Sequence, residues 1–292
     1  MSKLKDRLSL PGILVTDGAT GTMLQNAGLP VGAPSELWVL ENPDGVRALH
    51  RGYVEAGSDV ILTDTFGGTR IKLESNHLGD KVVEINLNAA RLAREIAGDK
   101  VFVFGDIGPT GKILEPLGAL SYAEAVDAFA EQAGALVKGG VDAIIIETMS
   151  DLSEAKAAIE GVRKVTDLPL AVSMSFDTRG RTMMGVKPAN AAKEFVALGV
   201  DIFGANCGRT LEETLTAIRE MRQLFPDAVL WAKPNAGLPH MDGSDTVYDV
   251  TPEVMAEYAL KFAGEGVKFF GGCCGSNPDH IRAIALTLHK PA

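Results

Sequence analysis

The sequence is poor in cysteine and in aromatic residues. Its 292 residues include three cysteines, and aromatic side chains make up 6% of the chain. An odd number of cysteines excludes a closed disulfide framework, and the adjacent pair Cys273 and Cys274 could bridge only with strain. Such sparing use of cysteine is typical of a reducing compartment, where grouped thiols bind metal or carry out chemistry. We therefore expect a cytoplasmic protein.

Positive charge and long apolar runs are also scarce. Lysine and arginine number 28 against 38 aspartates and glutamates, which gives a formal net charge of −10. Nucleic-acid binding needs a basic face, and the sequence has no run of lysine or arginine. The charged segment 1–10 has no signal-peptide core, and no stretch reaches the ~18 apolar residues of a membrane helix. We expect neither nucleic acid nor membrane as a partner.

What the sequence does contain is a repeated unit, a short apolar run followed by an amphipathic stretch. The runs are apolar on nearly consecutive residues, which is typical of parallel strands buried on both faces. They cover residues 13–16, 59–63, 101–104, 143–146, 170–173, 202–205, 229–232 and 268–270. Helix starts follow several of them: Ser121 begins a capping box with Glu124, Ser153 opens another helix, and Thr251 and Asn277 each precede a proline.

This alternation predicts an α/β fold built as a single (β/α)₈ TIM barrel. Eight strand–helix units in a chain of 292 residues agree with the usual size of that fold. No linker or low-complexity tract divides the chain, so residues 1–292 are expected to form one domain. A doubly wound open sheet shares the local alternation and is the competing fold. The even spacing of eight units favours the barrel, whose chemistry lies where strands end.

All three cysteines follow predicted strands. Cys207 comes after the sixth run, whereas Cys273 and Cys274 come after the eighth, inside a Gly-Gly-Cys-Cys-Gly segment. In a closed barrel the ends of the sixth and eighth strands are separated by one strand, so the three sulfurs are expected to share a site.

Three thiolates are soft ligands that select Zn²⁺, and a fourth open position is typical of a catalytic zinc. Because three thiolates leave the centre with a negative charge, its suited task is to hold an incoming thiol as a thiolate, which favours alkyl transfer to sulfur. The alternative is that the cysteines are small buried hydrophobic residues. The glycines around Cys273 and Cys274 favour the metal, since they let adjacent sulfurs turn inward.

Four further polar residues stand at predicted strand ends. Asp17 and Glu147 are carboxylates in places where burial is costly unless the charge is paired. Either they hold the ammonium group of an amino-acid substrate, or they cap backbone N–H groups of the following loops. Asn206 and Asn235 either contact substrate or metal, or serve as ordinary turn residues.

At these residues the sequence resembles the homocysteine S-methyltransferase family, which includes the homocysteine-binding module of cobalamin-dependent methionine synthase and the betaine–homocysteine methyltransferases. The resemblance runs from about Leu14 to His289. Its most specific motifs are residues 17–22 (DGATGT), 204–207 (GANC) and 271–275 (GGCCG). Residues 106–109 (DIGP), 147–148 (ET) and 233–237 (KPNAG) look most like the methionine synthase module.

The resemblance implies a (β/α)₈ barrel that binds one Zn²⁺ per chain through three thiolates. These ligands would be Cys207, Cys273 and Cys274. The substrate would be homocysteine, whose zinc-held thiolate attacks a methyl group in line and gives methionine without a general base.

The resemblance also implies substrate contacts. Asp17 and Glu147 match positions that hold the amino group of homocysteine. The backbone of Gly18 and Ala19 would help to hold its carboxylate. Two asparagines complete the set: Asn206 matches a binding-site residue, and Asn235 matches one that approaches the zinc when substrate is absent.

The methyl donor is expected to be a methylcorrinoid such as methylcobalamin, carried by a separate corrinoid protein. Cobalamin-dependent methionine synthases continue into folate, corrinoid and reactivation modules that have no counterpart in this sequence, and the C-terminal extension of the betaine enzymes is also missing. S-methylmethionine or another sulfonium or betaine-type donor is the alternative. Two further alternatives are a demethylating methyltransferase that works with a corrinoid protein, and a zinc- or thiol-binding sensor barrel without catalysis.

Overall fold

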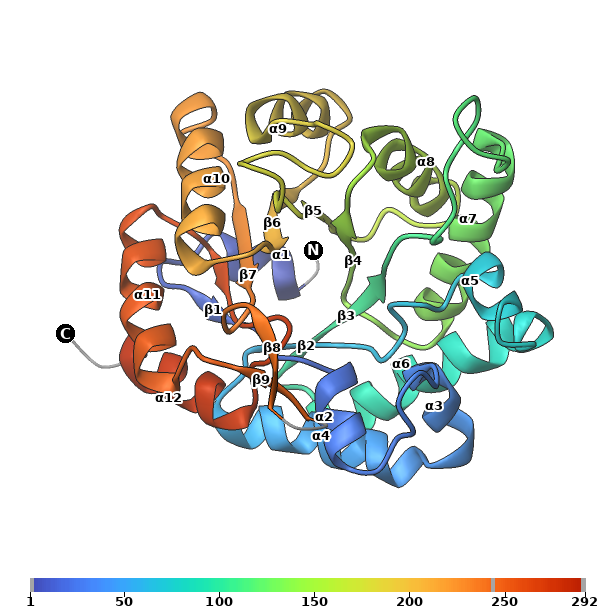
Figure 1. The fold of residues 1–292 in the computed structure, drawn as a ribbon, viewed down its shortest axis with the longest axis horizontal. Coiled ribbons are helices and arrows are strands. Elements are labelled where there is room, and N and C mark those ends of the chain that lie inside the picture. The colour runs from blue at the N-terminus through green and yellow to red at the C-terminus, as the bar shows by residue number, and fades with distance from the viewer. Residues whose placement is uncertain (1–2, 243–244, 290–292) are drawn as a thin grey trace.

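The computed structural model describes residues 3–242 and 245–289 and shows the expected parallel barrel (Figure 1). Its strands are β1 (Leu14–Val15), β2 (Val60–Leu62), β3 (Phe102–Ile107), β4 (Ala143–Met149), β5 (Leu170–Met174), β6 (Ile202–Cys207), β7 (Leu230–Pro234) and β10 (Phe269–Phe270). They pair in the order β1-β10-β7-β6-β5-β4-β3-β2. A parallel bridge between Thr16 and Val60 joins the two ends of this order, so the sheet closes on itself.

All eight predicted strands are confirmed, and five of them end later than expected, β5 by one residue at Met174. β3, β4, β6 and β7 each continue into polar residues that the sequence pattern had placed in loops. The main chain of several of these polar residues still pairs with the neighbouring strand, as Asp106 does with Ile145 and Asn206 with Lys233, whereas the register between β4 and β5 is interrupted between Ile146 and Met149. Asp106, Asn206 and Lys233 therefore stand on the hydrogen-bonded ladder of the barrel.

Alternate strand residues fill the inside of the barrel. Phe104, Trp231 and Phe269 stack there with ring centroids 5.3 to 5.7 Å apart. The short helix α1 (Lys3–Leu8) covers one end of the barrel, because Leu4 is 1% exposed and belongs to the same cluster (Figure 1). The inside of the barrel is thus filled by packed apolar side chains.

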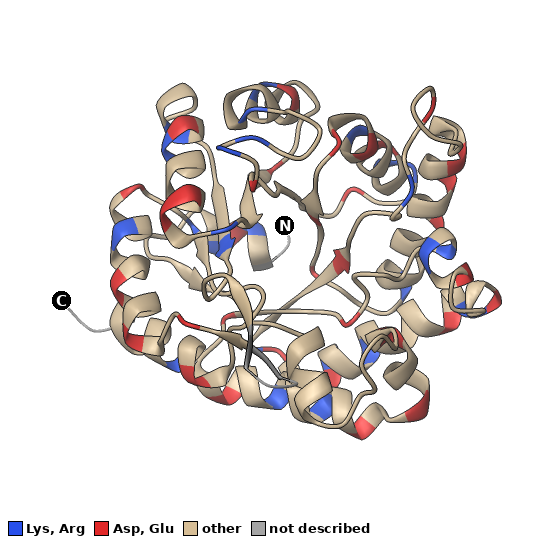
Figure 2. Cartoon of the chain, in the orientation of Figure 1, with Lys and Arg blue, Asp and Glu red and all other residues tan. Residues whose placement is uncertain are grey.

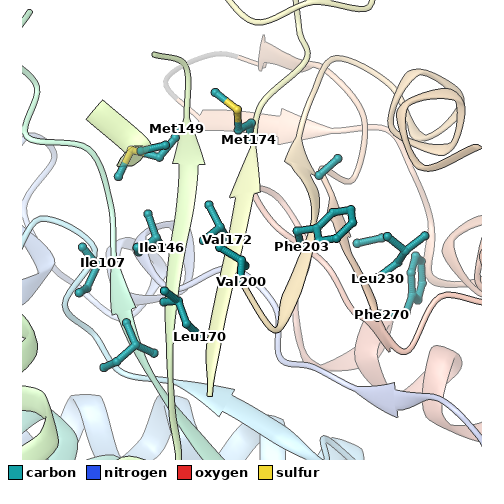
Figure 3. Close-up of a cluster of buried hydrophobic side chains, with 14 of the residues drawn as sticks. Ile107, Ile146, Met149, Leu170, Val172, Met174, Val200, Phe203, Leu230 and Phe270 are labelled. Carbon is teal, nitrogen blue, oxygen red and sulfur yellow. The ribbon is translucent and has the colours of Figure 1, made fainter. Parts of the chain in front are cut away.

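The remaining strand residues point outward and form a second core against the surrounding helices. Figure 3 shows part of this layer, where Ile107, Ile146, Val172 and Phe203 extend from neighbouring strands. The helices are α2 (Gly21–Asn26), α3 (Trp38–Glu41), α4 (Pro43–Ala56), α5 (Arg70–Glu74), α6 (Val82–Ala97), α7 (Tyr122–Lys138), α8 (Leu152–Arg163), α9 (Pro188–Ala197), α10 (Leu211–Leu224), α11 (Pro252–Gly264) and α12 (Pro278–Leu288), with 3₁₀ turns at Ser35–Leu37 and Gly79–Lys81.

The helix starts follow the sequence signals with one correction. Ser121 forms the expected capping box with Glu124, and Thr251 and Asn277 cap α11 and α12. Ser153 does not open α8. The Asp151 side chain caps that helix instead by accepting a hydrogen bond from the Ser153 amide, since a carboxylate at this position binds the free N–H groups of the first turn.

One hairpin has no counterpart in the sequence pattern. Strands β8 (Pro239–Asp242) and β9 (Asp245–Tyr248) form an antiparallel pair after β7. On the outer helices, acidic and basic residues are interspersed (Figure 2). In residues 3–242 and 245–289, no helix combines the length and the apolar character needed to cross a membrane.

Candidate metal and substrate site

The three cysteines meet at the carboxyl ends of β6 and β10. The sulfurs of Cys207, Cys273 and Cys274 all lie within 4.8 Å of one another. Cys207 Sγ and Cys273 Sγ are 3.1 Å apart, which is longer than the ~2.05 Å of a disulfide. Each cysteine is half-buried. The chain thus brings together residues that are 66 positions apart in sequence.

The backbone at the end of β6 turns sharply to present Cys207. This residue has a φ of +56°, a conformation that costs a non-glycine residue about 1–3 kcal/mol. Asn206 stabilises the turn from inside the barrel. Its Nδ2 donates to Thr148 Oγ1 (2.6 Å), and its Oδ1 accepts from Thr148 N (2.9 Å) and Ser173 Oγ (2.6 Å). Asn206 therefore positions Cys207, and its amide lies 3.5 Å from that sulfur.

Glycines let the other two cysteines approach β1. A Cβ on Gly271 would lie 2.1 Å from Thr16 Oγ1, and one on Gly272 would lie 2.3 Å from Ser276 Oγ. No side chain fits at either place, so the loop after β10 needs glycine there. Cys273 N donates to Pro234 O at 2.8 Å, which fixes the loop against the end of β7.

Asn235 links the two cysteine-bearing loops directly. Its Nδ2 donates to Gly208 O (2.8 Å), and its Oδ1 accepts from Cys274 N (3.0 Å). The side chain thus spans from the residue after Cys207 to the backbone of Cys274. It holds the distance between the sulfurs through hydrogen bonds to both loops.

The three sulfurs fit a metal by their chemistry and spacing. A tetrahedral zinc with Zn–S bonds of ~2.3 Å places its sulfurs ~3.8 Å apart, within the range of this cluster. Hydrogen bonds from the thiols of Cys207 and Cys273 lower the pKa of Cys274 to about 3. Hydrogen bonds with Cys273 and Cys274 raise the pKa of Cys207, so the metal-free cluster favours one deprotonated sulfur, at Cys274, and the thiolate is the form that binds metal.

Four charged side chains lie beside the cysteines inside the barrel, and two of them, Lys233 and Asp17, form an ion pair. Lys233 Nζ donates to Asp17 Oδ1 at 2.7 Å, and neither side chain is more than 3% exposed. Asp17 Oδ2 accepts a hydrogen bond from Leu62 N at 2.7 Å. Burial raises the pKa of Asp17, and Lys233 and the Leu62 amide oppose that rise. Asp17 thus has a hydrogen-bond partner on each oxygen.

The other two charged residues are Asp106 on β3 and Glu147 on β4. Both are buried, at 5% and 6% exposure. Burial raises the pKa of Glu147 to about 8, and burial together with the charge of Glu147 raises the pKa of Asp106 well above its usual value. The charge of Lys233 lowers both pKa values, but the effect of burial outweighs it.

Gly18 and Ala19 form the wall next to Asp17. A Cβ on Gly18 would lie 2.8 Å from the Tyr53 ring and from Ser276 Oγ, so the position needs glycine. The Ala19 amide donates to Ser276, at 3.2 Å to Oγ and 3.3 Å to the carbonyl oxygen. The amide of Ala19 is therefore engaged in this structure, whereas both residues still line the cavity.

A cavity of about 580 Å³ opens beside these groups. Its wall includes the three cysteines, the charged side chains of Asp64, Asp106, Glu147 and Lys233, and the loop at Gly18 and Ala19. Asp17 does not line the cavity and is connected to it through its ion pair with Lys233. Asn206 is buried beneath the cysteines, and Asn235 braces their loops from the side. The structure thus brings every predicted site residue to one mouth of the barrel.

Sequence reasoning missed Lys233, Asp106 and Tyr248. The strand pattern could have identified the first two. Lys233 stands two residues after Trp231, and Asp106 two residues after Phe104, so each shares the inward face of its strand with a large interior side chain. Tyr248 carried no such signal, because it comes from the unexpected hairpin. Its ring lies 2.2 Å from where a Cβ on Gly275 would stand.

Comparison with known proteins agrees with this geometry. The family model for homocysteine S-methyltransferase matches residues 14–288. The chain belongs to the homocysteine S-methyltransferase family. It is 33% identical to methionine synthase of Mycobacterium leprae over 298 residues, covering 95% of this chain and 24% of that protein. Methionine synthase of Mycobacterium tuberculosis gives 33% identity over 296 residues, covering 94% and 24%. The chain therefore spans about a quarter of the length of these relatives.

A solved structure shows the same fold. The metallated form of the homocysteine methyltransferase MmuM from Escherichia coli superposes with a TM-score of 0.79 at 23% identity, covering 97% of this chain and 98% of that one. This likeness supports the barrel fold of the present chain.

Proposed function

We propose that this protein is a zinc-dependent homocysteine S-methyltransferase that forms methionine, within a single barrel domain of residues 1–292 in the reducing cytoplasm. The observation that carries the proposal is the convergence of three cysteine sulfurs beside buried carboxyl groups in one cavity. Sulfur ligands suit Zn²⁺, and carboxyl groups suit the ammonium of an amino acid. Membership of the family supports the substrate.

Cys207, Cys273 and Cys274 would hold the metal. When bound, Zn²⁺ would stabilise the substrate sulfur as a thiolate at neutral pH. The chain itself orients the substrate. Carboxyl groups at the ends of the strands, assigned by the family resemblance to Asp17 and Glu147, bind its ammonium group. Asn206 and Asn235 position the cysteines through the hydrogen bonds described above.

We propose a methylcorrinoid on a separate protein as the methyl donor. Support comes from the 33% identity to methionine synthases, which exceeds the 23% identity to the MmuM structure. A sulfonium or betaine-type donor is the competing possibility, and the product assay below separates the two.

The test is elemental analysis of wild type and Cys207→Ala, together with homocysteine-dependent demethylation of free methylcobalamin. We expect about one zinc per chain in the wild type, and loss of both zinc and methionine formation in the variant, because two thiolates bind Zn²⁺ far more weakly than three. Wild type that has been stripped with a chelator and reloaded with Zn²⁺ is the control, and it should recover activity.

Each outcome has a distinct meaning. Zinc with methionine formed from S-methylmethionine or betaine, but not from methylcobalamin, would overturn the donor and keep the enzyme. A wild type that binds homocysteine and turns over no methyl donor would identify a sensor barrel. Absence of zinc after purification under reducing conditions and after reconstitution would refute the metal site.

A further inference from the structure

Thr148 on β4 and Cys207 on β6 both have a left-handed backbone conformation. Their φ angles are +62° and +56°. Residues other than glycine rarely adopt this conformation, and it is most costly for a β-branched residue such as threonine. Strain of this kind persists where the surrounding structure imposes it, and it gathers at functional sites. The backbone at Thr148 therefore points to a role for its side chain.

The strained backbone places two successive side chains on the cavity. Successive residues of a regular strand point to opposite faces of the sheet. Glu147 and Thr148 nevertheless both line the cavity, because the left-handed turn at Thr148 lies where the register between β4 and β5 is interrupted. The Thr148 hydroxyl thus faces the same space as the carboxyl group of Glu147.

Asn206 determines where the Thr148 hydroxyl can donate its proton. Thr148 Oγ1 accepts a hydrogen bond from Asn206 Nδ2 at 2.6 Å, so its own proton is left for another acceptor. Cys207 Sγ lies 3.9 Å from Oγ1, a long contact of the kind that often shortens when an active site is loaded. Asn206 Nδ2 is itself 3.5 Å from the same sulfur. Two donors therefore face Cys207 Sγ.

This pair of donors distinguishes Cys207 from the other two cysteines. The side-chain hydrogen bonds of Cys273 and Cys274 are made with cysteines. In a metal-bound cluster all three sulfurs are thiolates, and each is a possible nucleophile towards a methyl donor. A hydrogen bond to a thiolate stabilises its negative charge and lowers its nucleophilicity. The donors at Cys207 thus weaken that sulfur as a competitor of the substrate.

We propose that Thr148 protects Cys207 from methylation by donating a hydrogen bond to its sulfur, and so helps to direct the methyl group to the substrate. The inference rests on the proposed function and adds a residue to it. In the side reaction that Thr148 suppresses, an electron pair of Cys207 Sγ forms a bond to the methyl carbon. The bond between that carbon and its leaving group breaks, and the leaving group keeps the electron pair. Thr148 acts through Cys207 and is therefore a positioning residue.

The experiment measures methylation of the protein itself. Zinc-loaded wild type and Thr148→Val are treated with methyl iodide in the absence of any thiol substrate, and mass spectrometry of digested protein follows the methyl group on each cysteine. Valine keeps the β-branched shape and removes the hydroxyl. We expect methylation of Cys207 to become at least about tenfold faster, because a hydrogen bond to a charged sulfur is lost. The rates at Cys273 and Cys274 should stay at their wild-type values.

Two control variants separate the hydrogen bond from a general disturbance. Thr148→Ser keeps the hydroxyl and should restore the wild-type rate at Cys207. Thr214→Val makes the same substitution at a threonine that also contacts Cys207, but its Oγ1 donates to the carbonyl oxygen of that residue at 3.2 Å and not to the sulfur. Methylation of Cys207 in Thr214→Val should therefore stay at the wild-type rate.

Three results would overturn the inference. They are an unchanged rate at Cys207 in Thr148→Val, an equal increase at all three cysteines, and an increase in Thr214→Val as large as that in Thr148→Val. Circular dichroism and zinc content establish that each variant is folded and loaded, and Thr148→Ala replaces a valine variant that is not. A wild type that binds no zinc would instead refute the proposed function. Zinc-loaded wild type that forms methionine, with no change in Thr148→Val, refutes this inference alone.

Discussion

Asp64 and Glu36 form a second pair of buried carboxyl groups on the cavity wall, apart from the cysteines. Asp64 is 1% exposed and accepts a hydrogen bond from Ser35 Oγ at 2.6 Å, and Glu36 accepts one from the Gly67 amide. Burial, with the neighbouring charge of Glu36, raises the pKa of Asp64 to about 8. At neutral pH the folded protein therefore keeps a proton on this residue.

Because Asp64 keeps this proton only in the folded state, we expect the free energy of unfolding to depend on pH. An unfolded aspartate has a pKa of ~4, so the contribution of Asp64 is fully present below about pH 4 and is lost as the pH rises towards about 8. Asp64→Asn removes this dependence. The variant should gain stability relative to wild type by up to about 1.4 kcal/mol per pH unit between pH 5 and 8. Urea unfolding at pH 5, 6.5 and 8 measures the difference, and a constant difference would contradict the prediction.

For single side chains, the sequence predicted which residues belong to the site better than it predicted which residues contact one another. The cysteines, Asp17 and Glu147 were identified because their types at strand ends suggest chemistry. The partnership of Asp17 with Lys233 was not, because it joins residues 216 positions apart across the barrel. This pairing depends on β10 lying between β1 and β7 in the closed barrel, and no local sequence pattern predicts that arrangement.

Helices α7 and α8 pack closely enough that one glycine decides their distance. A Cβ on Gly161 of α8 would lie 2.5 Å from the carbonyl oxygen of Val126 and 2.9 Å from the Phe129 Cβ, both on α7. A methyl group there forces the helices apart, since their backbones are the atoms that clash. Gly134 on α7 offers the opposite case, because nothing lies within 4 Å of its added Cβ.

Alanine at these two positions should therefore act in opposite directions. Gly161→Ala is expected to lower the free energy of unfolding by about 1–3 kcal/mol through overpacking. Gly134→Ala should raise it by about 0.5–1 kcal/mol, because alanine loses less backbone entropy in a helix. Denaturant unfolding of both variants tests this, and equal effects of the two would show that helix propensity outweighs packing.

The elements themselves were largely predictable from sequence. Strands buried on both faces read as continuous apolar runs, and capped helices carry short polar signals. Strand ends were underestimated at β3, β4, β6 and β7, because polar residues there end the apolar pattern while the strand continues. The β8–β9 hairpin was missed, since its alternation is short and begins at Pro239, two residues after Gly237.

The barrel as a whole is closed by β10, which lies between β1 and β7. The proposed metal would join the end of β6 to the end of β10, and so would tie the last strand to the rest of the ring. Because the three sulfurs converge only in the folded chain, binding favours the folded state over the unfolded one.

Removing the metal should therefore lower the melting temperature of the whole molecule. Binding at a hundredfold excess over the dissociation constant stabilises a protein by about 2.7 kcal/mol. For a chain of this size that corresponds to several degrees, roughly 2–4 °C per kcal/mol. Calorimetry of metal-free and zinc-loaded protein measures the shift, with Cys207→Ser as the control that should show none. Equal melting temperatures in the wild type would contradict the prediction.

The split of the cysteines between β6 and β10 also sets an order of events during synthesis. As a nascent chain leaves the ribosome, Cys207 emerges well before Cys273 and Cys274, and domains are built from the N-terminal side first. The sulfur cluster cannot exist until the final strand has entered the gap between β1 and β7. Seven strands of the barrel thus precede the second and third thiols in the chain, and a chain broken off before the last strand offers a single thiol in place of three.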